Sequence, residues 1–143
     1  MKARVLHEAG ERTFAVVFDT DDEVIGGLLD FARRWKVTAA RFTAIGAFRR
    51  VTLGYFEWER KDYRKIPIEE QVEVLTLAGD IAHAGGRPAV HAHVVVGKAD
   101  GTAHGGHLLE AHVRPTLEVM LVESPAHLVR VHDDATGLAL IRL

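Results

Sequence analysis

The chain has 143 residues, of which 48% are hydrophobic and 27% charged, so it is long enough for one domain with a real core and unlike a disordered chain. It has no cysteine, which excludes disulfide scaffolds and cysteine-based zinc sites, and its formal net charge of -2 disfavours a dedicated nucleic-acid binder. No apolar run approaches the roughly 18 residues of a membrane span, and the N-terminus lacks a signal-peptide pattern. We therefore expect a cytoplasmic protein that does not bind membranes.

Two strands and one helix are predicted first in chain order. The strands cover residues 3–7 and 13–18, and the helix covers Asp21 to Trp35. Thr20 and Glu23 have the spacing of a capping box at the start of this helix. Apolar residues then follow at helical spacing, and Lys36 marks the end. It is the only long helix that the sequence predicts.

The remainder of the chain reads mainly as strands. Near-alternating apolar residues predict strands over residues 38–48, 50–58, 71–81, 89–97, 116–122, 128–132 and 138–143. Residues 59–67 are highly charged and predict an exposed connection, and the nearly continuous apolar run at 116–122 predicts a strand covered on both faces. The fold class is therefore α+β: a mainly antiparallel, strongly twisted sheet of about seven to nine strands with one main helix packed on it.

Histidine is the unusual feature of the composition. Nine are present, and six of them fall within 30 residues: His83, His91, His93, His104, His107 and His112. His91 and His93 are two positions apart on a predicted strand, so their side chains share one face, roughly 6.6 Å apart along the chain. Two imidazoles at that spacing can converge on one metal ion, with bonds of about 2.0–2.1 Å.

The hairpin after this strand decides which histidine is the third ligand. A plain two-residue turn at Asp100-Gly101 would place His93 opposite Leu108 and point His107 away. A three-residue loop, or a bulge at Gly105-Gly106, would change the parity and bring His107 to the face of His91 and His93. The glycine pair favours this second register, so the candidate metal triad is His91, His93 and His107.

Three histidines with an open fourth position suit zinc or a similar divalent metal that carries a water molecule. Such a water could act as a nucleophile. Glu110 and Glu123 are candidate bases or second-sphere groups, although glutamates of this kind are more often ordinary exposed acids. Spacing supports no other catalytic constellation, so whether the protein is an enzyme stays open and its catalytic residues stay unknown. No organic cofactor site is predicted.

Basic residues concentrate between Arg33 and Lys65. This segment holds ten of the 18 Lys and Arg residues against three acids, a local balance of +7. Such a segment could form a phosphate-facing patch, although charges of this kind are more often spread over a solvated surface. It leaves weak, non-specific nucleic-acid binding as a possibility.

The residues that carry these signals resemble a known family. The run Gly86 to His93, followed by His104-Gly105-Gly106-His107-Leu108, resembles the signature of the PPC domain, "plants and prokaryotes conserved". The segments 72–81 and 114–119 are similar to the strands before and after that signature, and the likeness extends over roughly residues 5 to 142. It implies one domain over residues 1–143, a homotrimer, and metal-ligand roles for His91, His93 and His107.

The resemblance leaves two classes of function open. One is a trimeric protein with a three-histidine, zinc-like site and a small-molecule or hydrolytic role. The other is a DNA-associated or regulatory protein-interaction module in which the metal is only structural. Plant members of the family carry AT-hooks, whereas here Gly86-Arg87-Pro88 runs directly into a predicted core strand. DNA affinity is therefore not carried over from those members.

Overall fold

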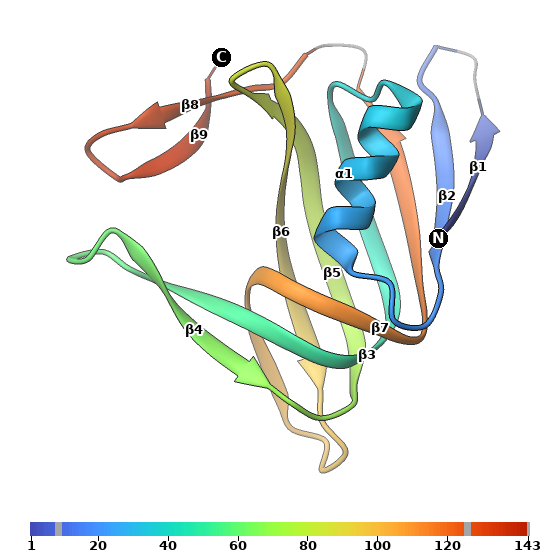
Figure 1. Ribbon diagram of the computed structural model, residues 1–143, viewed down its shortest axis with the longest axis vertical. Coiled ribbons are helices and arrows are strands. Elements are labelled where there is room, and N and C mark those ends of the chain that lie inside the picture. The colour runs from blue at the N-terminus through green and yellow to red at the C-terminus, as the bar shows by residue number, and fades with distance from the viewer. Residues whose placement is uncertain (8–9, 125–126, 143) are drawn as a thin grey trace.

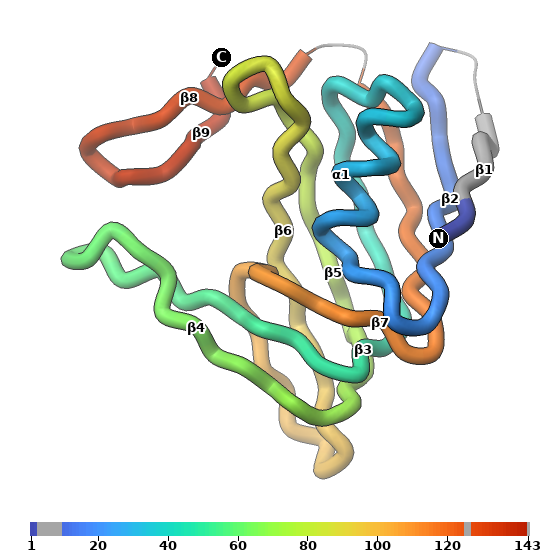
Figure 2. The backbone as a smooth tube through the Cα atoms, in the orientation of Figure 1, coloured from blue at the N-terminus to red at the C-terminus, as the bar shows by residue number. Residues whose placement is uncertain are grey.

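The computed structural model describes residues 1–7, 10–124 and 127–142. Figure 1 shows the helix lying against a curved sheet, and the tube in Figure 2 follows the same path of the chain. In chain order the elements are β1 (Lys2–His7), β2 (Thr13–Phe18), α1 (Val24–Trp35), β3 (Ala40–Glu57), β4 (Asp62–Ile68), β5 (Val72–Ala84), β6 (Arg87–Gly97), β7 (Ala103–Glu123), β8 (Val129–Asp133) and β9 (Leu138–Arg142). The predicted α+β class, with one helix on a mainly antiparallel sheet, is confirmed.

Four strands close the sheet into a ring. β3 pairs with both β5 and β7, and β6 pairs with the same two strands, so β3, β5, β6 and β7 surround a common core. β1 and β2 continue the sheet from β7, β4 pairs with the second half of β3, and β8 pairs with β5. Among the described residues β5–β8 is the one parallel pairing, and β8 continues to β9 as a hairpin that stands away from the ring (Figure 1).

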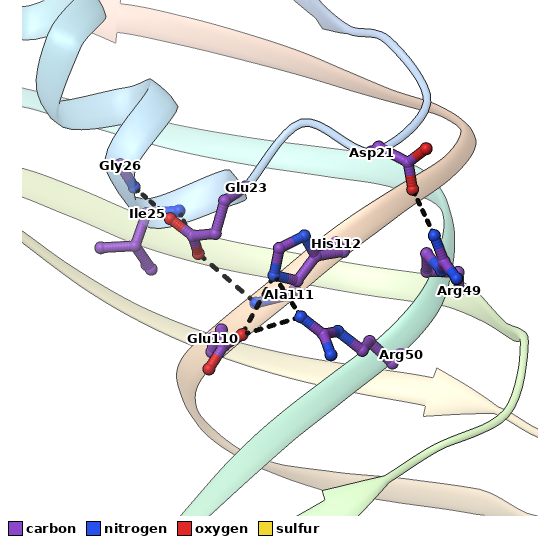
Figure 3. A network of polar contacts seen from close by, with 9 residues as sticks. All are labelled: Asp21, Glu23, Ile25, Gly26, Arg49, Arg50, Glu110, Ala111 and His112. Atoms are coloured by element: carbon purple, nitrogen blue, oxygen red, sulfur yellow. Dashed lines mark hydrogen bonds and ion pairs between the residues drawn. The ribbon is translucent and has the colours of Figure 1, made fainter.

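The helix begins three residues later than the sequence suggests. Glu23, not Thr20, is the N-cap, and its carboxylate accepts hydrogen bonds from the backbone N–H groups of Ile25 and Gly26 (Figure 3). The Thr20 hydroxyl donates instead to the carbonyl of Pro115. The capping-box interpretation is therefore wrong: the carboxylate expected at the third helical position caps the helix itself. The predicted end at Trp35 is correct, with Lys36 left-handed at φ 55°.

Three other predictions from the sequence need correction. The two strands expected over residues 38–48 and 50–58 are one bent strand, β3, which accommodates shifts in register around Gly46 without breaking. The expected connection over residues 59–67 contains most of β4, whose charges and Pro67 suit a strand at a sheet edge. Within a single chain the run 116–122 is covered on one face only: Leu117, Val119 and Leu121 are buried, while Met120 is 47% exposed.

Candidate metal centre

The hairpin between β6 and β7 determines which histidines share a face. Lys98 N–H donates to the Thr102 carbonyl at 2.9 Å, and Gly101 takes the left-handed φ of 82° that closes the turn. This is the longer loop of the two turn lengths considered. Pairing then runs without interruption from Gly97–Ala103 to His93–His107, so the loop, and no bulge at Gly105-Gly106, brings His107 opposite His93.

Three imidazoles meet on the outer face of the ring. His91 and His93 lie on β6 and His107 on β7, and one ring nitrogen from each lies within 4.8 Å of the others. The Nε2 atoms of His91 and His93 are 3.2 Å apart, and the three ring centroids are separated by 5.1, 5.1 and 5.4 Å. His93 is exposed, whereas His91 and His107 are half-buried. The structure thus brings the three predicted residues together, with the cluster open to solvent on one side.

Tyr63 of β4 forms one wall of this cluster. Its ring stacks on His107 with a centroid separation of 4.4 Å. Gly54, which pairs with His107, leaves the space for this ring, because a Cβ at Gly54 would lie 2.8 Å from Tyr63 Cδ1. Burial raises the pKa of Tyr63, so its phenol keeps the proton at neutral pH.

Burial and mutual proximity keep the half-buried imidazoles neutral. Burial, followed by the neighbouring His91, His93 and Arg130, lowers the pKa of His107 from 6.5 to about 4. Burial also lowers the pKa of His91, with further contributions from Arg130 and His93 against the opposing effect of Asp80. Neutral imidazole is the form that binds a metal ion, so both rings are in the binding form at neutral pH.

Two oppositely charged side chains, Asp80 and Arg130, lie next to Nδ1 of His91. Arg130 of β8 donates through Nη2 to both carboxylate oxygens of Asp80 at 2.8 Å, and the same nitrogen lies 3.2 Å from His91 Nδ1. Asp80 Oδ2 is 3.9 Å from that Nδ1. The Arg130 side chain is only 9% exposed, and this contact joins the β8–β9 hairpin to the candidate metal centre.

The other predicted acids and histidines are engaged elsewhere. Glu123 forms a two-point ion pair with Arg12 at 2.6 Å, and Glu110 contacts His112 and Arg50 (Figure 3). His104 lies 3.4 Å from the Thr102 hydroxyl. Glu110 and Glu123 are therefore engaged with these partners and do not take the predicted role of base at the histidine cluster.

Sequence reasoning missed three residues of the centre: Tyr63, Asp80 and Arg130. Tyr63 lies in the segment expected to be a connection. Asp80 follows a run of apolar residues in its strand and interrupts the apolar pattern. Arg130 is the single cation between Leu128 and Val131. A charged residue with an apolar neighbour on a strand is the signal that could have identified both.

The donor set fits a divalent metal ion. Three imidazole nitrogens suit zinc or a related late divalent ion, and His107 Nδ1 is buried without a hydrogen-bond partner among the described residues. Tetrahedral bonds of about 2.05 Å place ligand nitrogens about 3.3 Å apart. The His91–His93 separation of 3.2 Å matches that spacing, and the ligand nitrogen of His107 lies within 4.8 Å of the other two.

The depressed histidine pKa values predict a pH-dependent stability for the metal-free protein. Because His107 has a pKa of about 4 when folded and 6.5 otherwise, the unfolded chain binds more protons between these values. The free energy of unfolding should therefore fall as pH decreases from 6.5 to 4 and should be unaffected by this group above 6.5. Thermal unfolding after EDTA dialysis checks this. His107→Phe, which keeps a ring against Tyr63, should reduce the drop, and an equal drop in the variant contradicts the prediction.

Known proteins place the chain in a family. The family model for the Plants and Prokaryotes Conserved (PCC) domain matches residues 6–125. The chain belongs to this family. Among solved structures, a plant- and prokaryote-conserved (PPC) protein of Pyrococcus horikoshii is 31% identical, with a TM-score of 0.88 and 92% of each chain covered. The matched range includes residues 86–93 and 104–108, which carry the resemblance found in the sequence, so the predicted family is confirmed.

Two further solved structures are similar over nearly their whole length. A metal-containing protein from Archaeoglobus fulgidus is 31% identical, with a TM-score of 0.86, and covers 99% of this chain and 97% of its own. A protein from Ralstonia eutropha, provisionally named as DNA-binding, is 28% identical, with a TM-score of 0.85 and coverage of 91% and 90%. None of the curated proteins compared with this PPC domain matches it. Within the described residues no helix is both long and apolar enough to cross a bilayer.

Proposed function

We propose that this PPC-domain protein binds one zinc-like divalent ion per chain through His91, His93 and His107. The observation that carries the proposal is the convergence of three imidazole nitrogens within 4.8 Å on one face of the β6–β7 hairpin. The similarity to a metal-containing Archaeoglobus fulgidus protein supports it. The lowered pKa values of His91 and His107 support it further, because both imidazoles are neutral at neutral pH.

The proposed site has room for a fourth ligand. His93 is exposed, so water or a small molecule can reach the triad at this histidine. A zinc-like ion bound there would supply a Lewis acid and an acidified water. An open site favours small-molecule binding over a purely structural metal, which would be closed by four protein ligands.

Elemental analysis tests the metal assignment. Protein purified without a histidine tag and dialysed against metal-free buffer should retain about one divalent ion per chain, as a three-histidine site predicts. The same sample after EDTA treatment and dialysis is the control. Protein that retains no ion, and that takes up none from stoichiometric zinc, would overturn the proposal.

We also propose that the chain assembles as a homotrimer. The outer face of the ring leaves Ile45, Leu75 and Met120 61%, 54% and 47% exposed, and large apolar side chains on a sheet face need cover. One cross-strand row joins this face to the metal centre, because His93 pairs with Ala78, Ala78 with Thr43, and Thr43 with Met120. The number three is what the family resemblance implies.

Nucleic-acid association is the second candidate function, supported by the name of the Ralstonia eutropha relative. Against it, five of the ten basic residues between Arg33 and Lys65 are held in ion pairs with acids of this chain: Arg33, Arg49, Arg50, Arg60 and Arg64. An arginine that is paired with an acid adds little net positive charge to the surface that would face a phosphate backbone. We therefore infer weak, sequence-independent binding at most.

A duplex titration distinguishes the two functions. We expect weak binding that disappears as salt rises from about 50 to 200 mM, because counterion release drives it. Labelled duplexes of several sequences, measured by fluorescence anisotropy at about 150 mM salt, should be indistinguishable. Tight binding to one duplex, with a large preference over its scrambled control, would place DNA recognition first.

A further inference from the structure

The two ring nitrogens of His91 face different partners. Nε2 points into the histidine cluster, where it lies 3.2 Å from His93 Nε2. Nδ1 points to the opposite side, 3.2 Å from Arg130 Nη2 and 3.9 Å from Asp80 Oδ2. The nitrogen that could bind a metal ion is therefore Nε2, and the nitrogen that Asp80 and Arg130 control is Nδ1.

Arg130 fixes the proton of His91 when no metal is bound. A guanidinium has donors and no acceptor, so a hydrogen bond at this 3.2 Å contact requires that His91 Nδ1 accepts and carries no proton. The single proton of the neutral ring is then on Nε2. From there it can be donated to His93 Nε2, which matches the 3.2 Å separation of these atoms.

This arrangement opposes metal binding at Nε2. A neutral imidazole that binds a metal through Nε2 carries its proton on Nδ1, and that proton usually goes to a carboxylate or carbonyl. His91 Nδ1–H would no longer accept from Arg130. It would need an acceptor, and Asp80 Oδ2, now 3.9 Å away, is the carboxylate on that side.

We propose that Asp80 and Arg130 are positioning residues with opposite effects, which together set the tautomer of His91. Arg130 favours the Nε2–H tautomer of the metal-free protein, and Asp80 favours the Nδ1–H tautomer needed for metal binding. On metal binding, the His91 imidazole loses the proton on Nε2 and gains one on Nδ1, so the charge of the imidazole does not change. The inference rests on the proposed metal site and adds the control that these two residues exert over it.

The change in the His91 tautomer also affects a contact of the β8–β9 hairpin. Arg130 lies on β8, whose pairing with β5 is limited to His83–Val129 and Ala84–Arg130. Arg130 Nε is buried without a partner among the described residues, so the guanidinium is held mainly through its Nη atoms. When His91 no longer accepts from Nη2, the docking of this hairpin loses one contact.

Nitrogen NMR and metal affinity test the proposal together. Long-range ¹H–¹⁵N spectra distinguish protonated from unprotonated ring nitrogens, and His91 is assigned by the signals lost in His91→Gln. Without zinc, His91 should have its proton on Nε2. With one equivalent of zinc, the proton should be on Nδ1. This measurement uses the wild-type chain, so a variant that fails to fold leaves it intact.

Two substitutions at the same ion pair should change zinc affinity in opposite directions. Asp80→Ala removes the acceptor for Nδ1–H and should weaken zinc binding by about 10- to 100-fold. Arg130→Met removes the competing donor and should tighten binding by about tenfold. Competition against a zinc-binding dye gives both constants. Arg142→Met, an exposed arginine on the partner strand of the same hairpin, is the control and should have no effect.

The outcomes separate this inference from the metal proposal. If the pair only anchored the hairpin, both variants would weaken zinc binding, and that result overturns the inference while leaving the metal site. Zinc-free wild-type protein with the His91 proton on Nδ1 overturns it as well. A wild-type chain that binds no zinc overturns the proposed function, and this inference with it.

Discussion

Replacing His91 and His93 together by alanine should reduce bound zinc from about one equivalent per chain to background. Each chain would keep one imidazole, His107, and a single neutral ligand cannot hold the ion against dialysis. Metal content measured against protein concentration on the same untagged sample gives the result. The substitutions lie on the outer face of β6, where His93 is exposed, so the fold should persist.

The control for this experiment is a histidine of the same hairpin that lies outside the triad. His104, exposed at the start of β7, supplies it, and His104→Ala should retain full zinc content. Circular dichroism confirms that each variant is folded. Metal content that is substoichiometric in the wild type and unchanged in the double variant would exclude the assignment.

Placing a charge on the exposed apolar face should break the assembly. Wild-type protein is expected to elute with about three times the chain mass of 15.8 kDa at micromolar concentration. Ile45→Glu combined with Met120→Glu should give the single-chain mass, because burying a large apolar side chain contributes about 1.5–3 kcal/mol and a buried unpaired carboxylate costs more. Light scattering coupled to size exclusion measures both masses.

Leu140→Glu provides the comparison, because Leu140 is also 40% exposed but lies on the β8–β9 hairpin. It should leave the mass unchanged. A wild-type monomer, or a dimer that persists on dilution, contradicts the trimer. If Leu140→Glu also dissociates the protein, the interface includes the hairpin and the outer face alone does not explain assembly.

The parts of the fold that depend on local pattern could be predicted from the sequence. Helical spacing located α1 to within its first turn, and alternation located β2, β5 and β6 closely. Parity along two strands was enough to name the histidine triad, because a hairpin allows only two faces. The prediction still depended on loop length, which Asp100-Gly101 leaves open and which the left-handed Gly101 decides.

The parts that depend on distant segments could not be predicted. β4 is polar and contains Pro67, and it is a strand because β3 offers it an edge. Asp80 and Arg130 are 50 positions apart in the chain, and nothing in the spacing shows that β8 returns beside β5. Glu23 becomes the cap because its backbone bridges to His112, a contact made by tertiary packing.

The ring of β3, β5, β6 and β7 has a consequence for the order in which the protein can form. β3 is made early, but its pairing with β7 joins Ala40 to Glu123 and Gly54 to His107. During synthesis, the edge of β3 that pairs with β7 therefore has no strand partner until the last third of the chain has emerged, although β4 and β5 can pair with β3 before then. Contacts so distant in sequence make folding slow. The β6–β7 hairpin that carries the three histidines is, by contrast, local, and can form before the ring closes around it.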